Sequence, residues 1–276
     1  MKRERYGLRS QCKRIALACC VSLGPFSASG QMPTNQFRFA DYLLVPLAVH
    51  FLAASNSPSI QTTLTDKDLD RILGKMNQVW GQAGVHFYLQ SLRREETKES
   101  EKWAGPDRHP DGADLLSLRP REFISTNAFN IYYIKKMSVN GIYFPEGIFV
   151  KDSASLRPVE GGIDEPLPRV SSHELGHALG LSHRQNTTNL MASGTTGTWL
   201  NTEEIHEARV KAREFEWIVP APQAMGKANA LFDQGKLSEA MLWYLKVANI
   251  SSDGEEVKLA RKRIAGEVPR RQPAAP

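Results

Sequence analysis

The feature that most constrains this chain is the run His-Glu-Leu-Gly-His-Ala-Leu-Gly-Leu-Ser-His at residues 173–183. His173 and His177 are four residues apart, so on a helix they lie one turn apart on the same face, where two imidazoles can bind one ion. Glycine adopts positive φ without strain, so Gly180 can end the helix and turn the chain sharply. We therefore expect a helix that ends near Gly180 and a return of His183 to the same ion.

Three histidines in this pattern indicate a catalytic zinc site. Catalytic zinc has three protein ligands and one open position, whereas structural zinc has four ligands and often uses cysteine. All three cysteines, Cys12, Cys19 and Cys20, lie in the first 30 residues, far from the motif. Glu174, beside the first ligand, is expected to be the general base on a zinc-activated water. The sequence thus predicts one catalytic Zn²⁺ ion and peptide-bond hydrolysis.

The run at 173–183 resembles the signature of the metzincin zinc peptidases. Met191 resembles the methionine turn of that family, and its distance of eight residues from His183 is similar to the spacing in matrixins. The resemblance implies a metal set of three histidines, a glutamate base and an endopeptidase activity. It is most specific over 173–191 and extends more weakly over roughly residues 40–217.

Hydrophobic patterning predicts strands and helices in a mixed order, and therefore an α+β domain with a twisted mixed sheet. We expect Pro46 to mark an edge or a bulge, because proline cannot donate to a sheet. Arg93 to Arg119 is expected to be a polar surface loop. The expected strands are Tyr42 to Ala54, Val85 to Leu92, Phe129 to Ile134 and one or two within Gly141 to Val150. The expected helices run from a cap at Thr65 to Gly84, from near Val170 through the motif, and from Thr202 to Phe215.

A peptidase can hold an extended peptide by pairing it with an exposed sheet edge. In the family that this sequence resembles, that edge strand lies shortly before the motif helix and runs antiparallel to the substrate. Gly141 to Val150 is the last strand-like stretch before His173. The residues expected to build this edge are Ile142, Phe144, Ile148 and Val150.

Residues 1–30 resemble an export signal, with a basic stretch, the apolar run Ile15 to Phe26 and then small residues. The run is shorter than the ~20 apolar residues that span a bilayer, so no stable membrane span is expected after the signal is removed. A short membrane anchor is the alternative. We therefore expect a secreted or periplasmic protein.

The formal net charge of +5 comes from this segment, which holds six basic residues and one acid. The rest of the chain has 29 basic and 29 acidic residues, so the composition argues against a nucleic-acid partner. The expected partner is a protein or peptide substrate.

Residues 221–268 resemble a single tetratricopeptide-like helical repeat, with Ala240 and Tyr244 at packing positions and Gly235 in the turn. Such a unit can serve as a protein-binding module or pack on the catalytic domain, and the second role is slightly favoured. The predicted organisation is a signal at 1–30, a peptidase domain at 37–218, the helical segment at 221–268 and a disordered tail at 269–276.

The sequence therefore predicts an exported zinc endopeptidase. Two alternatives stay open. One is an interaction module whose zinc site is vestigial, and the complete set of ligands and base argues against it. The other is a zinc amidase that acts on cell-wall peptides.

Overall fold

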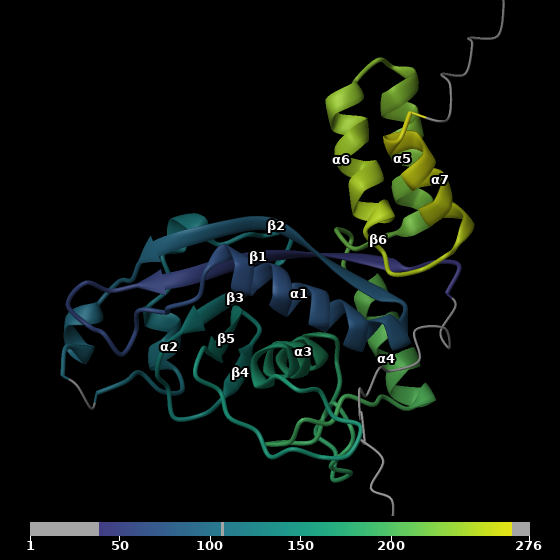
Figure 1. Ribbon diagram of the computed structural model, residues 1–276. Coiled ribbons are helices and arrows are strands. Elements are labelled where there is room, and N and C mark those ends of the chain that lie inside the picture. Colours follow the sequence, from purple (N-terminus) through teal and green to yellow (C-terminus); the bar gives the residue numbers. More distant parts are fainter. Residues whose placement is uncertain (1–38, 106–107, 267–276) are drawn as a thin grey trace, which may run out of the picture. The chain divides into compact units, whose positions relative to one another are not determined.

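The computed structural model describes residues 39–105 and 108–266, which combine one mixed sheet with helices (Figure 1). The strand order is β2-β1-β3-β5-β4, with β6 beside β1; β1, β2, β3 and β5 are parallel, and β4 and β6 are antiparallel to their neighbours. The strands are β1 (Leu43–Ala53), β2 (Val85–Glu96), β3 (Phe129–Ile134), β4 (Gly141–Phe144), β5 (Gly147–Lys151) and β6 (Val219–Pro220). The α-helices are α1 (Asp66–Trp80), α2 (Asp114–Ser117), α3 (Pro166–Ala178), α4 (Thr202–Arg213), α5 (Ala221–Asp233), α6 (Leu237–Ala248) and α7 (Glu255–Ile264). The expected mixture of helices around a mixed sheet is confirmed.

Alternation along β1 separates the core into layers, because successive side chains of a strand point to opposite faces. The odd-numbered residues from Leu43 to Phe51 pack with α1 and α3 in the main hydrophobic cluster. On the other face, Leu52 packs with Leu115 and Leu118 around α2. Helix α3, which carries the histidine motif, is therefore fixed against the centre of the sheet.

Local signals explain where the helices begin. Thr65 caps α1 through a reciprocal capping box with Asp68, as expected. Asn201 caps α4 in the same way with Glu204. Helix α3 begins at Pro166, earlier than the expected Val170. Proline is tolerated in a first turn because the amide groups there have no partner within the helix.

The sheet differs from expectation in one respect and agrees in part in another. Strand β2 continues through Glu96, so the first residues of the expected loop are strand. Pro46 was expected at an edge or a bulge; it does not lie at an edge, because β1 lies between β2 and β3, but the register shifts close by, between Leu47 and Ala48. Val219–Pro220, between the predicted peptidase domain and the helical segment, pairs with the start of β1.

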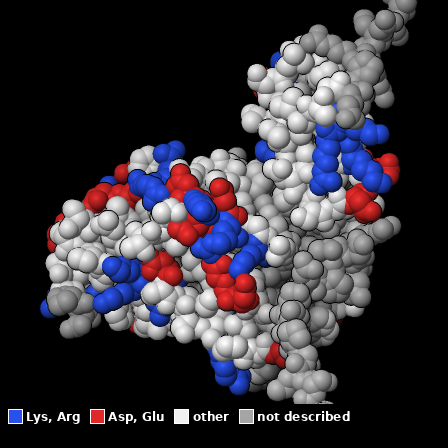
Figure 2. Space-filling model, viewed as in Figure 1, with Lys and Arg blue, Asp and Glu red and all other residues white. Residues whose placement is uncertain are grey.

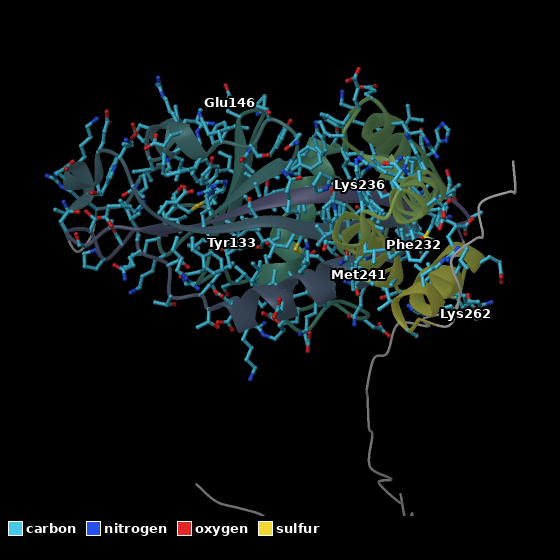
Figure 3. All side chains as sticks on the ribbon, turned by 90° about the horizontal axis from the view of Figure 1, so that it is seen from above. Tyr133, Glu146, Phe232, Lys236, Met241 and Lys262 are labelled. Carbon is cyan, nitrogen blue, oxygen red and sulfur yellow. The ribbon has the colours of Figure 1, made fainter. Side chains whose placement is uncertain are left out.

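Helices α5, α6 and α7 share a hydrophobic cluster with Tyr42 and Leu44, at the start of β1. Gly235 has φ 78° in the turn between α5 and α6, and Ala240 and Tyr244 are buried, as the repeat-like pattern predicted. Figure 3 shows Met241 on this helical segment, where its side chain is exposed. The three helices therefore pack against the sheet through β1.

Acidic and basic side chains intermingle on the face shown in Figure 2, over α1 and the sheet beside it. Many are paired, among them Arg94 with Asp66 and Lys75 with Asp164. Within the described ranges, no helix combines the length and apolar character needed to cross a bilayer. The expected export signal at 1–30 and the tail at 269–276 lie outside the described residues.

Candidate metal centre

The three motif histidines are brought together by one helix and the turn that ends it. His173 and His177 lie on α3, which ends at Ala178. The amide of Gly180 donates to the His177 carbonyl (3.0 Å) and that of Leu181 to the Gly176 carbonyl (2.9 Å), which is the hydrogen-bond pattern of a Schellman turn. Gly180 has φ 88°, so the expected helix-ending turn is present. The chain reverses there and returns His183 toward the helix.

The ring nitrogens of these histidines converge on one point. His177 Nε2 lies 3.2 Å from His173 Nε2 and 3.1 Å from His183 Nε2. All three ligand atoms lie within 4.8 Å of one another. Among the described residues, this is the one group of three or more histidine, cysteine or carboxylate side chains that could hold a metal ion.

Backbone carbonyls orient two of the rings. His173 Nδ1 lies 2.8 Å from the Leu190 carbonyl oxygen, and His177 Nδ1 lies 2.8 Å from the Leu181 carbonyl oxygen. A carbonyl oxygen only accepts, so His177 Nδ1 carries the proton. Arg169 Nη1, which only donates, lies 3.2 Å from His173 Nδ1, but the Leu190 carbonyl is nearer at 2.8 Å and assigns the proton to that nitrogen too. In the neutral imidazoles, each Nε2 then presents a lone pair. Two lone pairs facing each other at 3.2 Å repel unless a cation lies between them, so the donor set fits a bound metal ion.

Burial keeps these rings neutral. It lowers the pKa of His173 to about 3, with the nearby Arg169 guanidinium adding to the effect, and it lowers the pKa of His177. A neutral imidazole is the form that binds metal. The two rings are therefore ready to act as ligands at neutral pH.

Glu174 lies beside the histidines, with 6% of the residue exposed. Burial raises the pKa of its carboxyl to about 8, against the opposing effect of Arg169. Glu174 and the three histidines line one hollow of about 590 Å³, together with Gly141 to Tyr143 of β4 and Ser193–Gly194. The carboxyl group and the nitrogen cluster therefore face the same open space.

Met191 lies beneath the motif helix. It is fully buried, and a Cβ atom built on Gly176 would lie 2.5 Å from its sulfur. Asn189 Oδ1 accepts from the Met191 amide at 2.6 Å, which shapes the turn. The absence of a side chain at Gly176 thus lets the methionine approach the helix between the two ligands.

Two buried charged residues hold this region, and the sequence reasoning missed both. Glu204 of α4 accepts from Arg184 Nε (2.6 Å) and from Asn189 Nδ2 (2.8 Å), and so links the loop after the third histidine to a helix cap. Arg169, one turn before His173, donates to the carbonyl oxygens of Gly197 (3.1 Å) and Ala192. The only sequence signal for the role of Arg169 is its place in a largely apolar helix, four residues before His173.

Of the two strands expected to build the substrate edge, one lies at the edge of the sheet and the other lies inside it. Ile142 and Phe144 lie on β4, at the edge of the sheet. Ile148 and Val150 lie on β5, which is paired with β3 on one side and β4 on the other. Backbone groups of β5 are thus used inside the sheet and cannot pair with a peptide. The sequence could not distinguish the two strands because both are short and apolar.

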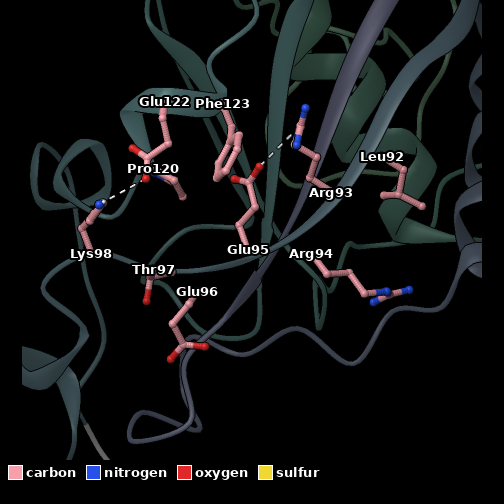
Figure 4. Close-up of a pocket in the computed structure, with 10 residues that line it drawn as sticks. All are labelled: Leu92, Arg93, Arg94, Glu95, Glu96, Thr97, Lys98, Pro120, Glu122 and Phe123. Atoms are coloured by element: carbon pink, nitrogen blue, oxygen red, sulfur yellow. Dashed lines mark ion pairs between the residues drawn. The ribbon is translucent and has the colours of Figure 1, made fainter.

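A second hollow lies along the end of β2, on the sheet rather than beside the motif helix (Figure 4). Its charged side chains pair with one another, Arg93 with Glu95 and Lys98 with Glu122. Glu95 also accepts from His50, a buried histidine that lies outside the cluster of motif histidines. This hollow lacks a group of convergent ligands and is not the metal site.

Replacing His183 by alanine is expected to weaken zinc binding by at least about tenfold to a hundredfold, because ligand loss should exceed the effect of losing an outer hydrogen bond. His206→Ala, on the exposed surface of α4, should bind zinc like the unmodified protein. Zinc content after dialysis at fixed free zinc measures both. Equal zinc in the two variants would contradict the role of His183.

No protein-family model matches this chain, and no curated protein matches it.

Proposed function

We propose that this protein is a zinc-dependent endopeptidase. The observation that carries the proposal is the convergence of three imidazole nitrogens beside a buried carboxyl group, all facing one open hollow. Three histidines with an open fourth position make up the ligand set of catalytic zinc. A structural site would have filled that position with a fourth protein ligand.

The spacing of the nitrogens is compatible with zinc. Zinc–nitrogen bonds of about 2.0–2.1 Å in tetrahedral geometry separate two ligand nitrogens by about 3.3 Å. The separations of 3.1 and 3.2 Å around His177 Nε2 are close to this value, and all three ligand atoms lie within 4.8 Å of one another. Zinc, when bound, would polarise the scissile carbonyl and lower the pKa of a water molecule toward about 7.

Glu174 moves the proton in the proposed reaction. As a carboxylate it takes a proton from the attacking water, and as a carboxylic acid it gives that proton to the leaving amine nitrogen. Its burial excludes bulk water, and its place on the helix beside His173 directs it to the hollow. His173, His177 and His183 would hold the ion, and backbone carbonyls orient the rings of His173 and His177.

The free edge of β4 suits an extended peptide. In the β4–β5 pair, the amide of Lys151 donates to the Asn140 carbonyl at 2.9 Å. Hydrogen-bonding alternates along an antiparallel pair, so the backbone groups of Gly141 and Tyr143 point away from β5. They line the same hollow as Glu174. A peptide added to this edge would therefore pass beside the base and the histidines.

The resemblance to metzincins, with a spacing to Met191 similar to that in matrixins, supports the same activity. The buried methionine beneath the ligands and an edge strand before the motif helix agree with that resemblance. We also propose export, from the signal-like residues 1–30, and a possible protein contact through the C-terminal helices. The proposed partners are a protein or peptide substrate, without nucleic acid.

The experiment that tests the proposal is zinc analysis of the purified protein followed by peptide-library cleavage with and without a chelator. We expect about one zinc per chain, and cleavage that is lost with chelator and restored by zinc. Bound zinc without any cleavage would support the vestigial interaction module instead. Cleavage of cell-wall peptides alone would support the amidase.

A further inference from the structure

Gly141 is the first residue of β4 and faces helix α3. A Cβ atom built on it would lie 2.6 Å from Glu174 Oε1 and 2.8 Å from Glu174 Cγ. It would also lie 2.6 Å from Val170 Cγ1. Real Cβ atoms essentially never approach other atoms within 3.0 Å, so a side chain at 141 and the present position of Glu174 exclude each other.

The overlap cannot be relieved by a small movement of a flexible tip. The Cγ atom of Glu174 is involved as well as its oxygen, so the whole side chain would have to rotate. Val170 is 3% exposed and belongs to the main core, where packing is close to that of an organic crystal. Gly141 is not among the glycines with positive φ, so space rather than backbone conformation requires a glycine here.

We propose that Gly141 is a positioning residue for the general base. Because Gly141 has no side chain, it leaves the space that the Glu174 side chain occupies, with the carboxyl group facing the histidine nitrogens. The inference rests on the proposed peptidase function, and it adds a residue outside the motif to the machinery. The amide and carbonyl groups of Gly141 also point to the free edge of β4. One residue therefore positions the general base and also offers backbone groups to the proposed substrate strand.

The test compares Gly141→Ala in the unmodified protein and in a Glu174→Ala background. In the unmodified protein, kcat should fall at least about 100-fold, because a displacement of about 1 Å in a reacting group has an effect of this size. Zinc affinity should stay within about threefold, since no ligand moves. KM should change little compared with kcat.

In the Glu174→Ala background no glutamate side chain fills the space beside Gly141. Adding Gly141→Ala should therefore lower the residual activity no further. A general distortion of the edge or of the metal site would lower it again. Gly74→Ala, an exposed glycine of α1 with open space around it, is the matched control and should leave kcat unchanged.

A stability measurement tests the contact without activity. Gly141→Ala should lower the midpoint of thermal unfolding in the unmodified protein and lower it less when Glu174 is alanine, because residues in contact are not additive. This coupling is expected even if no peptide is ever cleaved, which separates failure of the contact from failure of the proposed function.

Three results would overturn the inference. The first is wild-type kcat in a folded Gly141→Ala variant. The second is an equal loss of stability in both backgrounds. The third is recovery of activity when Val170→Ala is added to Gly141→Ala, which would assign the strain to Val170 rather than to Glu174.

Discussion

Replacing Glu174 by glutamine is expected to lower kcat by about 10²- to 10⁴-fold while zinc binding and the fold are kept. Glutamine has nearly the same shape, so it still fits against Gly141 and Val170. Its amide, however, cannot take a proton from water or return one to the leaving nitrogen. The three ligands are untouched, so the metal content should equal that of the unmodified protein.

The measurement is single-peptide hydrolysis together with zinc analysis on the same preparation. Glu146→Gln is the matched control, because Glu146 is exposed at the turn between β4 and β5 (Figure 3). It should cleave at the normal rate. Comparable hydrolysis by the Glu174→Gln variant would remove Glu174 from the mechanism.

Replacing Arg169 by methionine is expected to destabilise the protein by at least about 2 kcal/mol. The guanidinium donates to the carbonyl oxygens of Gly197 and Ala192, and a methionine would leave these two buried acceptors without their donor, whereas the Asn189 carbonyl keeps the Ala192 amide. Each unsatisfied buried group costs about 1–3 kcal/mol. Burial lowers the pKa of Arg169 to about 10, so the side chain is still charged at neutral pH.

The loop that Arg169 holds also carries the carbonyl that orients His173, at Leu190. We therefore expect weaker zinc binding in the Arg169→Met variant as well as a lower denaturation midpoint. Arg169→Lys should be intermediate, because a lysine cannot span several carbonyls with a planar fork. Arg213→Met, on the half-exposed surface, should change the stability by no more than about 1 kcal/mol. Similar stability for Arg169→Met and Arg213→Met would contradict this account.

Short-range rules predicted most of the geometry of the candidate metal centre. The four-residue spacing of His173 and His177 and the positive φ of Gly180 follow from helix geometry alone. The capping of α1 by Thr65 is equally local. Each of these features depends on a few neighbouring residues, so a single sequence contains the information.

The rest depends on contacts between residues far apart in the chain. Arg169 and Glu204 are polar residues whose roles appear only when the loop at 189–197 is folded against them. The internal position of β5 depends on pairing with β3, which its own residues do not specify. Gly141 was expected only as the first residue of a strand-like stretch, because nothing nearby in the sequence indicates that Glu174 will lie against it.

The start of β1 contacts residues that come late in the chain. β6, at Val219–Pro220, pairs with Leu43 and Leu44, and helices α5–α7 cover Tyr42 and Leu44. A ribosome releases the chain from its N-terminus, so β1 is made well before the residues that complete its environment. Contacts of such long sequence separation slow folding, because the intervening chain must be ordered first. Completion of the environment of β1 therefore waits until residues 219–264 have been synthesised, and a nascent chain that stops near residue 218 leaves the apolar start of β1 exposed.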